Sequence, residues 1–439
     1  MNFFQILTII ILTVFLCINT YAETPCSHQE TILSLDQVIA KATEANHLIH
    51  ISQIDLNASK EAKKEAFTEF LPKLKTEYGY TYLNEVNYVT LNNTKFFFGT
   101  QDNYRWTTSA IQNIFTGLAV LSQYQIADIE KEISEIRKAD TRLTIILDAK
   151  KSFFAVQNAK LLVEVGDKAV KSLEDHLSIA REYYDVGLSP KIDVLNAEVD
   201  LAEVQQDLEK AKNNVVIAKA ALNNMIDLPV DTPIDTAGTL KYSPFPLSYE
   251  QCIGKAVELR PGIKTAAKKI EVAKKQIQLA RSDYSPDITA SLNYNRAGDK
   301  PEVQGSVYDD RENWNAMVTA TWTFWEWGKT RHAVLQSKEG LKKTIKQMSI
   351  VEDRVHFEVK DAYYSLQTAQ HNISVAEKSV ASAEENLRIS KERYKEQVAI
   401  VTEVLDAETR LTRARTFLTN ALNDYNVAMA TLYWAIGME

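Results

Sequence analysis

Glycine, proline and cysteine are scarce in this chain of 439 residues, which has 13 Gly, 10 Pro and three Cys. Three cysteines cannot form a disulfide-rich scaffold or a repeated zinc module. The sequence has neither a Walker-type phosphate loop nor a GxGxxG motif, so we expect no nucleotide site. It also has no HExxH motif and no arguable Ser-His-Asp or Cys-His arrangement. We therefore predict a protein that is not an enzyme.

Basic residues are outnumbered as well, because 50 Lys and Arg stand against 58 Asp and Glu, for a net charge of −8. A nucleic-acid-binding protein would show a basic face or stripe, so nucleic acid is disfavoured as a partner. The apolar share of 45% and the charged share of 25% exclude a disordered chain and a polytopic membrane protein. Beyond the N-terminal segment, no stretch reaches the ~18 consecutive apolar residues of a transmembrane helix.

The N-terminal segment from Phe3 to Ile18 is almost wholly apolar and is followed by polar residues and Tyr21-Ala22. This pattern predicts a signal peptide over residues 1–22. Because no Lys or Arg precedes the apolar run, an uncleaved membrane anchor is the alternative. The mature chain would keep Cys26 and Cys252, which can pair in an oxidising compartment, although the sequence does not show that they meet.

An internal duplication dominates the chain. The run Ser34-Leu35-Asp36-Gln37 recurs 214 residues later as Ser248-Tyr249-Glu250-Gln251. Farther along, Val194-Leu195-Asn196-Ala197-Glu198 recurs 210 residues later as Val404-Leu405-Asp406-Ala407-Glu408. We therefore predict a first repeat over residues 23–227, a proline-containing linker over residues 228–247, in which a short strand is possible, and a second repeat over residues 248–439.

The same order of elements is expected in both repeats. Each opens with a helix that a Ser-x-x-Gln capping box starts and a proline ends, over residues 34–70 and 248–285. Two strands follow in each repeat, over residues 78–82 and 104–115 in the first and over residues 288–295 and 314–324 in the second. Apolar and polar residues alternate in them, and aromatic residues mark their ends. Such strands are typical of transmembrane β-structure with a lipid face and a wet lumen. A soluble hairpin with one buried face is the alternative.

A very long helix is predicted next in each repeat, over residues 117–184 and 328–394. At 1.5 Å per residue, nearly 70 residues span about 100 Å. A heptad seam of alternating large and small residues runs from Val156 to Tyr184 and from Leu366 to Tyr394, which suits knobs-into-holes packing. A shorter helix returns over residues 192–226 and 401–436. Because the apolar seam is narrow, we expect these helices to form the wall of a hollow tube.

Four strands cannot close a barrel, and open sheet edges are not tolerated in lipid. Three chains would supply twelve strands under cyclic symmetry. The predicted fold class is therefore α+β: a long α-helical coiled-coil barrel joined to a trimeric 12-stranded transmembrane β-barrel, with four strands per chain. The loops over residues 84–103 and 296–313 would face the outside.

Several short motifs occur in a fixed order and in duplicate: Tyr184-Asp185-Val186-Gly187-Leu188 before Ile192-Asp193-Val194-Leu195-Asn196-Ala197, then Thr402-Glu403-Val404-Leu405-Asp406-Ala407, with the junctions Phe115-Thr116-Gly117 and Trp325-Glu326-Trp327-Gly328. In these motifs the whole mature chain resembles the TolC-like outer membrane efflux proteins. The resemblance implies a homotrimer in outer-membrane lipid with a long periplasmic extension and no cofactor. It implies the passive exit duct of a tripartite efflux or type I secretion system, docked to a periplasmic adaptor (membrane fusion protein) and an inner-membrane RND or ABC transporter. The alternative is a periplasmic coiled-coil adaptor or scaffold anchored by an uncleaved N-terminal segment.

The resemblance also implies roles for residues at the two helix-turn-helix tips. By matching motif positions, Glu403 and Asp406 would line a periplasmic aperture, where three chains supply a ring of carboxylates that favours cations. The alternative is that both are solvated acids at a helix start. Asp193 and Tyr394 match positions that help to hold closed tips together. The sequence departs from the family at Ala399, where a basic residue would be expected.

The first tip is expected to contact the adaptor through Val186, Gly187 and Leu188.

Elsewhere, His47 and His50 are three residues apart on a predicted helix, a spacing that can bind a metal ion. No third ligand is apparent near them in the sequence, so we predict no metal site.

Overall fold

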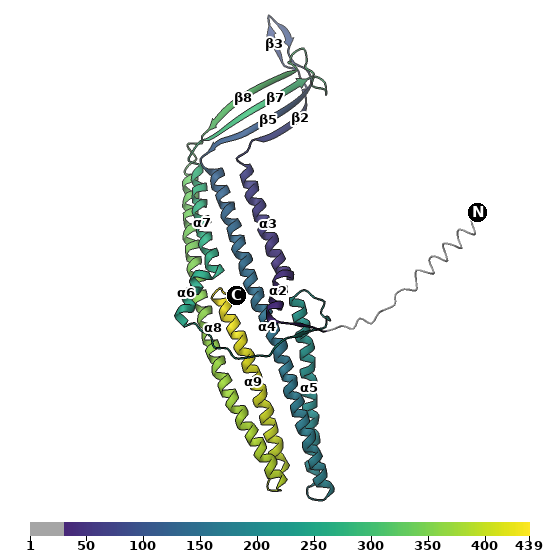
Figure 1. Cartoon of the computed structure of the whole chain (residues 1–439). Helices are drawn as coiled ribbons and strands as arrows, with labels where there is room; N and C mark the ends of the chain where they lie inside the picture. Colours follow the sequence, from purple (N-terminus) through teal and green to yellow (C-terminus); the bar gives the residue numbers. More distant parts are fainter. Residues whose placement is uncertain (1–29) are drawn as a thin grey trace, which may run out of the picture.

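The structure is a computed structural model that describes residues 30–439. The predicted signal peptide and Cys26 lie outside the described residues. A four-stranded sheet forms one end of the elongated molecule, and long helices extend from it to two helix-turn-helix tips at the other end (Figure 1). The ends of the described chain, by contrast, lie near the middle of its length.

Both repeats have the same order of helices and long strands, and the first repeat contains in addition the short strands β1, β3 and β4. The first contains β1 (Thr31–Leu33), α2 (Leu35–Ala45), α3 (His47–Thr68), β2 (Lys73–Tyr82), β3 (Tyr88–Leu91), β4 (Thr94–Phe97), β5 (Asp102–Thr116), α4 (Ala119–Asp185) and α5 (Lys191–Met225). The linker contributes β6 (Ile234–Thr236), which pairs in parallel with β1. The second repeat contains α6 (Tyr249–Leu259), α7 (Pro261–Ser282), β7 (Asp287–Gly298), β8 (Glu312–Thr321), α8 (Lys329–Lys395) and α9 (Val401–Ala435).

The opening helix of each repeat begins as predicted but is not continuous. Ser34 and Ser248 both form complete capping boxes with the glutamine three residues later. The prediction of one helix over residues 34–70 is wrong, because Asn46 adopts an extended conformation and caps α3 through Leu48 N–H. The prediction over residues 248–285 is wrong for a related reason. Pro261 disfavours a helical conformation for Arg260, so α6 ends there and α7 begins.

The four long strands form one antiparallel sheet in the order β2-β5-β7-β8. The four predicted strands are confirmed, except that β8 ends at Thr321, short of the predicted residue 324. The central pair, β5 with β7, joins the two repeats. The edge strands β2 and β8 are exposed along their whole length. Each edge therefore offers unpaired backbone groups to a further strand.

A second, smaller hairpin was missed by the sequence analysis. Strands β3 and β4 lie within the predicted outer loop at residues 84–103 and pair antiparallel, with Tyr88 opposite Phe97. Asn92 and Asn93 form the turn between them, both with positive φ. Two such residues between apolar runs are a known hairpin signal, so the sequence contained the information.

The two longest helices, α4 and α8, have 67 residues each. Helices α3 and α5 pack along α4, α7 and α9 pack along α8, and α4 also contacts α7 and α9. Much of each predicted heptad seam is buried, including Val156, Leu173 and Leu177 on α4 and Leu366, Ile373 and Leu387 on α8, but the seam on α4 does not stay buried to its predicted end, since Tyr184 is 43% exposed. The predicted wall of packed helices is thus confirmed.

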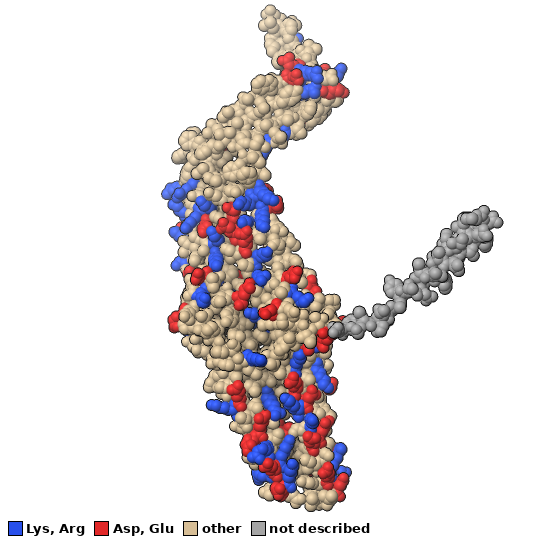
Figure 2. Space-filling view, viewed as in Figure 1, with Lys and Arg blue, Asp and Glu red and all other residues tan. Residues whose placement is uncertain are grey.

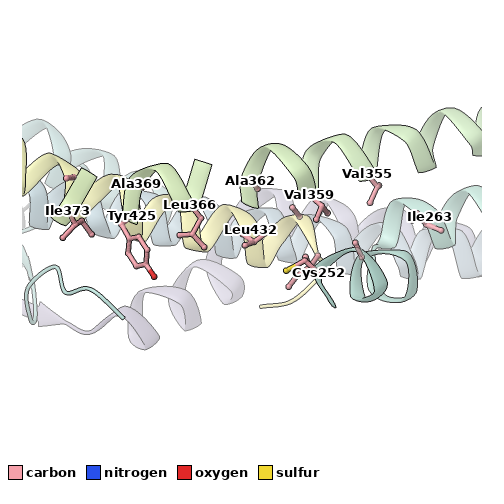
Figure 3. Packing of buried hydrophobic residues seen from close by; sticks show 14 of the residues in the cluster. Cys252, Ile263, Val355, Val359, Ala362, Leu366, Ala369, Ile373, Tyr425 and Leu432 are labelled. Carbon is pink, nitrogen blue, oxygen red and sulfur yellow. The ribbon is translucent and has the colours of Figure 1, made fainter. Parts of the chain in front are cut away.

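The thickest apolar packing lies at mid-length, where the short helices meet the long ones. One cluster joins α6, α7, α8 and α9, and Figure 3 shows Cys252, Val359, Leu366 and Leu432 within it. Cys252 is fully buried there, and Cys26, the partner with which it can pair, lies outside the described residues. Among residues 30–439, no helix combines the length and the apolar character needed to cross a membrane.

Candidate tunnel aperture and tip contacts

The two tip turns have the same backbone geometry although their sequences differ. The Leu188 N–H donates to Tyr183 O at 2.8 Å, and the Val398 N–H donates to Arg393 O at 2.9 Å. A helix that ends with this hydrogen bond requires one residue in the left-handed conformation just after its last turn. Gly187 supplies it in the first tip with φ +75°, and Gln397 supplies it in the second with φ +58°.

The predicted adaptor-contacting residues lie at the extreme end of the first tip. Val186 is 68% exposed, and Gly187 and Leu188 are exposed beside it. The second tip presents Val398 and Ile400, which are equally exposed. Both tips therefore display apolar side chains at the end of the molecule farthest from the sheet.

The predicted aperture residues lie in the first two turns of α9. Glu403 and Asp406 are three residues apart, so their side chains share one face of the helix. The Glu403 Oε2 lies 3.1 Å from Arg393 Nη1, in an ion pair that the sequence analysis missed. Asp406 is exposed and has no ion pair within the described part of the chain. The structure therefore leaves one of the two carboxylates without a cationic partner.

Asp193 and Tyr394, the predicted pair at the closed tips, lie near each other but form no hydrogen bond within residues 30–439. Tyr394 is only 6% exposed, and its hydroxyl has no hydrogen-bond partner among those residues. Burial, followed by the charges of Asp193 and Tyr183, raises the pKa of Tyr394. Burial also raises the pKa of Asp193. The charge of Asp193 thus acts on Tyr394 without a hydrogen bond between the two side chains.

A buried polar cluster stands next to Tyr394 and was not foreseen. The His176 ring on α4 lies 5.3 Å from the Tyr394 ring and is 4% exposed. Burial, and then the charge of Lys391, lower the pKa of His176 to about 4. Lys391 Nζ donates to Ser172 Oγ at 2.7 Å and lies 3.5 Å from Glu408 Oε2. The sequence contained only a weak indication that His176 is buried, because the residue lies next to the heptad-seam position Leu177.

Acidic side chains continue along the wall above the aperture residues. A cavity of about 230 Å³ lies beside α4, α5 and α9, where Asp200, Glu203 and Glu408 line it together with Arg413. Burial, followed by repulsion from Glu203 and Asp406, raises the pKa of Asp200. The negative charge at Asp406 therefore belongs to a larger acidic region.

The remaining candidate residues have ordinary structural environments. His47 Nε2 lies 3.2 Å from Asp227 Oδ1 on the surface. Within the part of the chain that the structure describes, no three His, Cys, Asp or Glu side chains are placed to hold a metal ion.

Comparison with known proteins gives a consistent result over nearly the whole chain. Residues 38–226 and 252–438 match the family described as "Outer membrane efflux protein". The chain is 22% identical over 417 residues to Outer membrane protein TolC of Escherichia coli (strain K12), covering 92% of this chain and 82% of that protein. It is 21% identical over 328 residues to Outer membrane efflux protein BepC of Brucella suis biovar 1 (strain 1330), covering 74% of this chain and 70% of that protein.

Solved structures share the fold at low sequence identity. A crystal structure of CusC has a TM-score of 0.80 at 16% identity, covering 93% of this chain and 94% of that one. The CmeC outer membrane channel of Campylobacter jejuni has a TM-score of 0.78 at 16% identity, covering 92% and 85%. The outer membrane protein VceC of Vibrio cholerae has a TM-score of 0.76 at 17% identity, covering 92% and 96%.

Proposed function

Because the chain belongs to the outer membrane efflux protein family, we propose that three copies of it form one continuous passive duct across the outer membrane and the periplasm. The protein is an outer-membrane exit duct for efflux, with its helices extending into the periplasm. This assignment replaces the alternative of an anchored periplasmic scaffold. The duct has no catalytic centre, and a partner supplies the energy for transport.

The pairing of β5 with β7 is the observation that supports a closed trimer. Strand β7 is the second-repeat counterpart of β2, and β8 is the counterpart of β5. The contact between β5 and β7 inside one chain is therefore a template for a contact between β8 and β2 of the neighbouring copy. Three such contacts join twelve strands and remove every exposed edge, as lipid requires.

The helical edges are suited to the same arrangement. On α8, Ile350 and Phe357 are exposed although they are large and apolar, and on the opposite edge Ile54, Val216 and Ile217 are exposed as well. Inside the chain, α4 packs against α7 and α9. Helix α8 contacts α3 and α5 of the next copy in the same way, which removes these apolar side chains from water.

The tips are the surface for the remaining partners. A periplasmic adaptor contacts the exposed apolar side chains of the tip that contains Val186, Gly187 and Leu188, and an inner-membrane transporter of the RND or ABC class drives the cargo. At the same end, Glu403 and Asp406 of three copies form the carboxylate ring of the aperture. Asp193 and Tyr394 help to hold the closed tips together.

A register-specific disulfide tests the trimer. The pairing of Ala110 with Leu292 in the chain maps, through the repeat, onto Ala320 of one copy and Tyr78 of the next. The double variant Ala320→Cys/Tyr78→Cys is expected to give a covalent trimer in outer-membrane fractions on oxidation. Thr319→Cys/Tyr78→Cys is the matched control, because neighbouring residues of a strand point to opposite faces.

Only the first variant should yield a trimer that a reducing agent dissociates. Equal cross-linking of both variants, or monomers alone, contradicts the proposed closure. Ion conductance by the purified trimer in a planar lipid bilayer tests the duct itself.

A further inference from the structure

Four large aromatic side chains are gathered between the sheet and the longest helix of the second repeat. Trp322, Phe324, Trp325 and Trp327 follow β8 and precede α8, and Phe324 and Trp327 are 78% and 88% exposed. Indole rings in outer-membrane proteins are favoured at the boundary between lipid and water. This aromatic segment, residues 322–327, therefore marks the periplasmic surface of the membrane.

A groove of about 250 Å³ opens between this segment and the first turn of α8. Tyr284, Trp322, Phe324 and Trp325 supply its apolar side, and Lys329, Arg331, Asp283 and Glu326 supply its charged side. Lys329 Nζ lies 3.3 Å from Glu326 Oε2 in an exposed pair, which contributes little. Arg331 has no ion pair among residues 30–439. The groove thus joins an apolar wall to a free guanidinium group.

The surface around the groove is strongly basic. Residues 261–283 contain six Lys and Arg against two Asp and Glu, and residues 326–346 contain the same numbers. These two segments have a surplus of positive charge in a chain whose net charge is −8. Figure 2 shows basic side chains gathered on the helices directly below the nearly uncharged sheet. Within the described part of the chain, Arg281, Arg331 and Lys338 form no ion pair.

The opposite edge of the molecule differs at the same height. Lys63, Lys73 and Lys75 lie where α3 meets β2, and each is paired with an acidic side chain at 2.6–2.7 Å. Their charge is locally neutralised. The larger group of unpaired basic side chains near the sheet therefore lies on the edge formed by α7 and α8.

We propose that the groove beneath the aromatic segment binds an anionic phospholipid of the periplasmic leaflet, with its phosphate at Arg331 and Lys329 and its acyl chains along Trp322 and Phe324. The positive surplus favours a net-negative head group over a zwitterionic one. The occupant is a lipid because the apolar side of the groove, from Trp322 to Trp325, follows directly on the end of β8, the strand that the proposed barrel places in the membrane. This inference rests on the outer-membrane location of the protein and not on its conductance.

Lipid retention tests the proposal directly. The purified full-length protein is reconstituted in nanodiscs that contain equal amounts of phosphatidylglycerol and phosphatidylcholine, and the lipids that stay bound are counted by native mass spectrometry. We expect phosphatidylglycerol to be enriched. Each basic side chain near an anionic lipid surface is worth about a fivefold change. Lys329→Gln/Arg331→Gln should therefore lower the enrichment at least about fivefold.

Lys210→Gln/Lys212→Gln is the matched control, since it removes two lysines on α5 that are already paired, with Asp207 and Glu209, away from the sheet. It should keep the enrichment of the unchanged protein. Trp322→Ser/Phe324→Ser, which changes the two side chains assigned to the acyl chains, should lower the retention of both lipids. The oligomeric state and the circular dichroism of each variant show whether it has folded.

Three results overturn the proposal. The first is equal retention of the two lipids by the unchanged protein, and the second is equal loss in the variant and its control. The third is displacement of phosphatidylglycerol by inorganic phosphate, which would make the groove a site for free anions. Conductance in a planar bilayer is measured separately, so a failure of the lipid site and a failure of the duct can be told apart.

Discussion

Gly187 and Gln397 occupy the same position in the two tip turns, with φ of +75° and +58°. Each donates its backbone N–H to a carbonyl three residues earlier, at 3.0 Å. A side chain in this conformation is unfavourable by about 1–2 kcal/mol, whereas glycine adopts it freely. The second tip is therefore strained where the first is relaxed.

Replacing Gln397 by glycine should relax the second tip. After the greater entropy loss of glycine is subtracted, we expect a stabilisation of about 0.5–1 kcal/mol. Hydrogen exchange of the amides in residues 396–399 should slow by a few fold. Gly187→Ala is the reciprocal variant and should speed exchange in residues 186–189. Faster exchange in Gln397→Gly would contradict the strain.

The proposed aperture ring predicts an effect on ion selectivity. Replacing both Glu403 and Asp406 by alanine should lower the preference for cations in planar-bilayer recordings, because three copies lose six carboxylates from the constriction. Glu384→Ala is a suitable control, since Glu384 pairs with Arg415 higher on the helices. Unchanged selectivity in the double variant would remove both residues from the aperture.

The ion pair between Arg393 and Glu403 predicts the opposite change. Arg393→Ala frees a carboxylate whose charge is now partly balanced at 3.1 Å. The cation preference should rise, and it should return to its original value when Glu403→Ala is added. An unchanged preference on Arg393→Ala would contradict this effect, and a rise that persists after Glu403→Ala is added would mean that the arginine itself, and not Glu403, acts on the ions.

His176 predicts a loss of stability in acid. Its pKa in the folded protein is about 4, below the value of about 6.5 for an unfolded chain. Above pH ~6.5 the ring is neutral in both the folded and the unfolded protein. As the pH falls from about 6.5 to about 4, the unfolded protein binds a proton that the folded protein does not, so the free energy of unfolding falls. The full loss of stability is about 3 kcal/mol. The thermal midpoint of His176→Gln should fall less over this range than that of the unchanged protein, and parallel curves would exclude His176 as the cause.

Arg260 predicts a large effect at mid-length. It is buried, donates from Nη1 to Trp434 O at 2.6 Å, pairs with Glu358 at 3.1 Å and stacks 3.7 Å from the Trp434 ring. Arg260→Met should destabilise the protein by about 3 kcal/mol, because Glu358 loses its partner in a partly buried site. Arg281→Met, at an exposed and unpaired arginine, should change the thermal midpoint little. Similar midpoints for the two variants would refute this role.

Periodicity made the main elements predictable. The alternation in β7 and β8 and the heptads of α4 and α8 are local properties of the sequence, and the structure confirms them. The break at Arg260 was also readable, because Pro261 follows it. The turn at Asn92 and Asn93 was not predicted, because it lies within the polar segment over residues 84–103, which was interpreted as a loop.

The contacts at the tips could not be read in the same way. His176 meets Tyr394, and Arg393 meets Glu403, only because two helices pack in one particular register. A shift of α8 by a single turn, about 5.4 Å, would separate His176 from Tyr394 without changing either heptad pattern. The family's motif positions pointed to Glu403 and Tyr394, but only packing reveals their neighbours.

The junction of β5 with β7 has an evolutionary consequence. In the proposed trimer, every contact that joins one half of the subunit to the other has a counterpart at the seam between subunits, which makes the wall pseudo-sixfold. A polypeptide of half this length could have built the same ring from six copies. Fusion of two such genes would then have allowed the halves to diverge, leaving glycine at one tip and glutamine at the other.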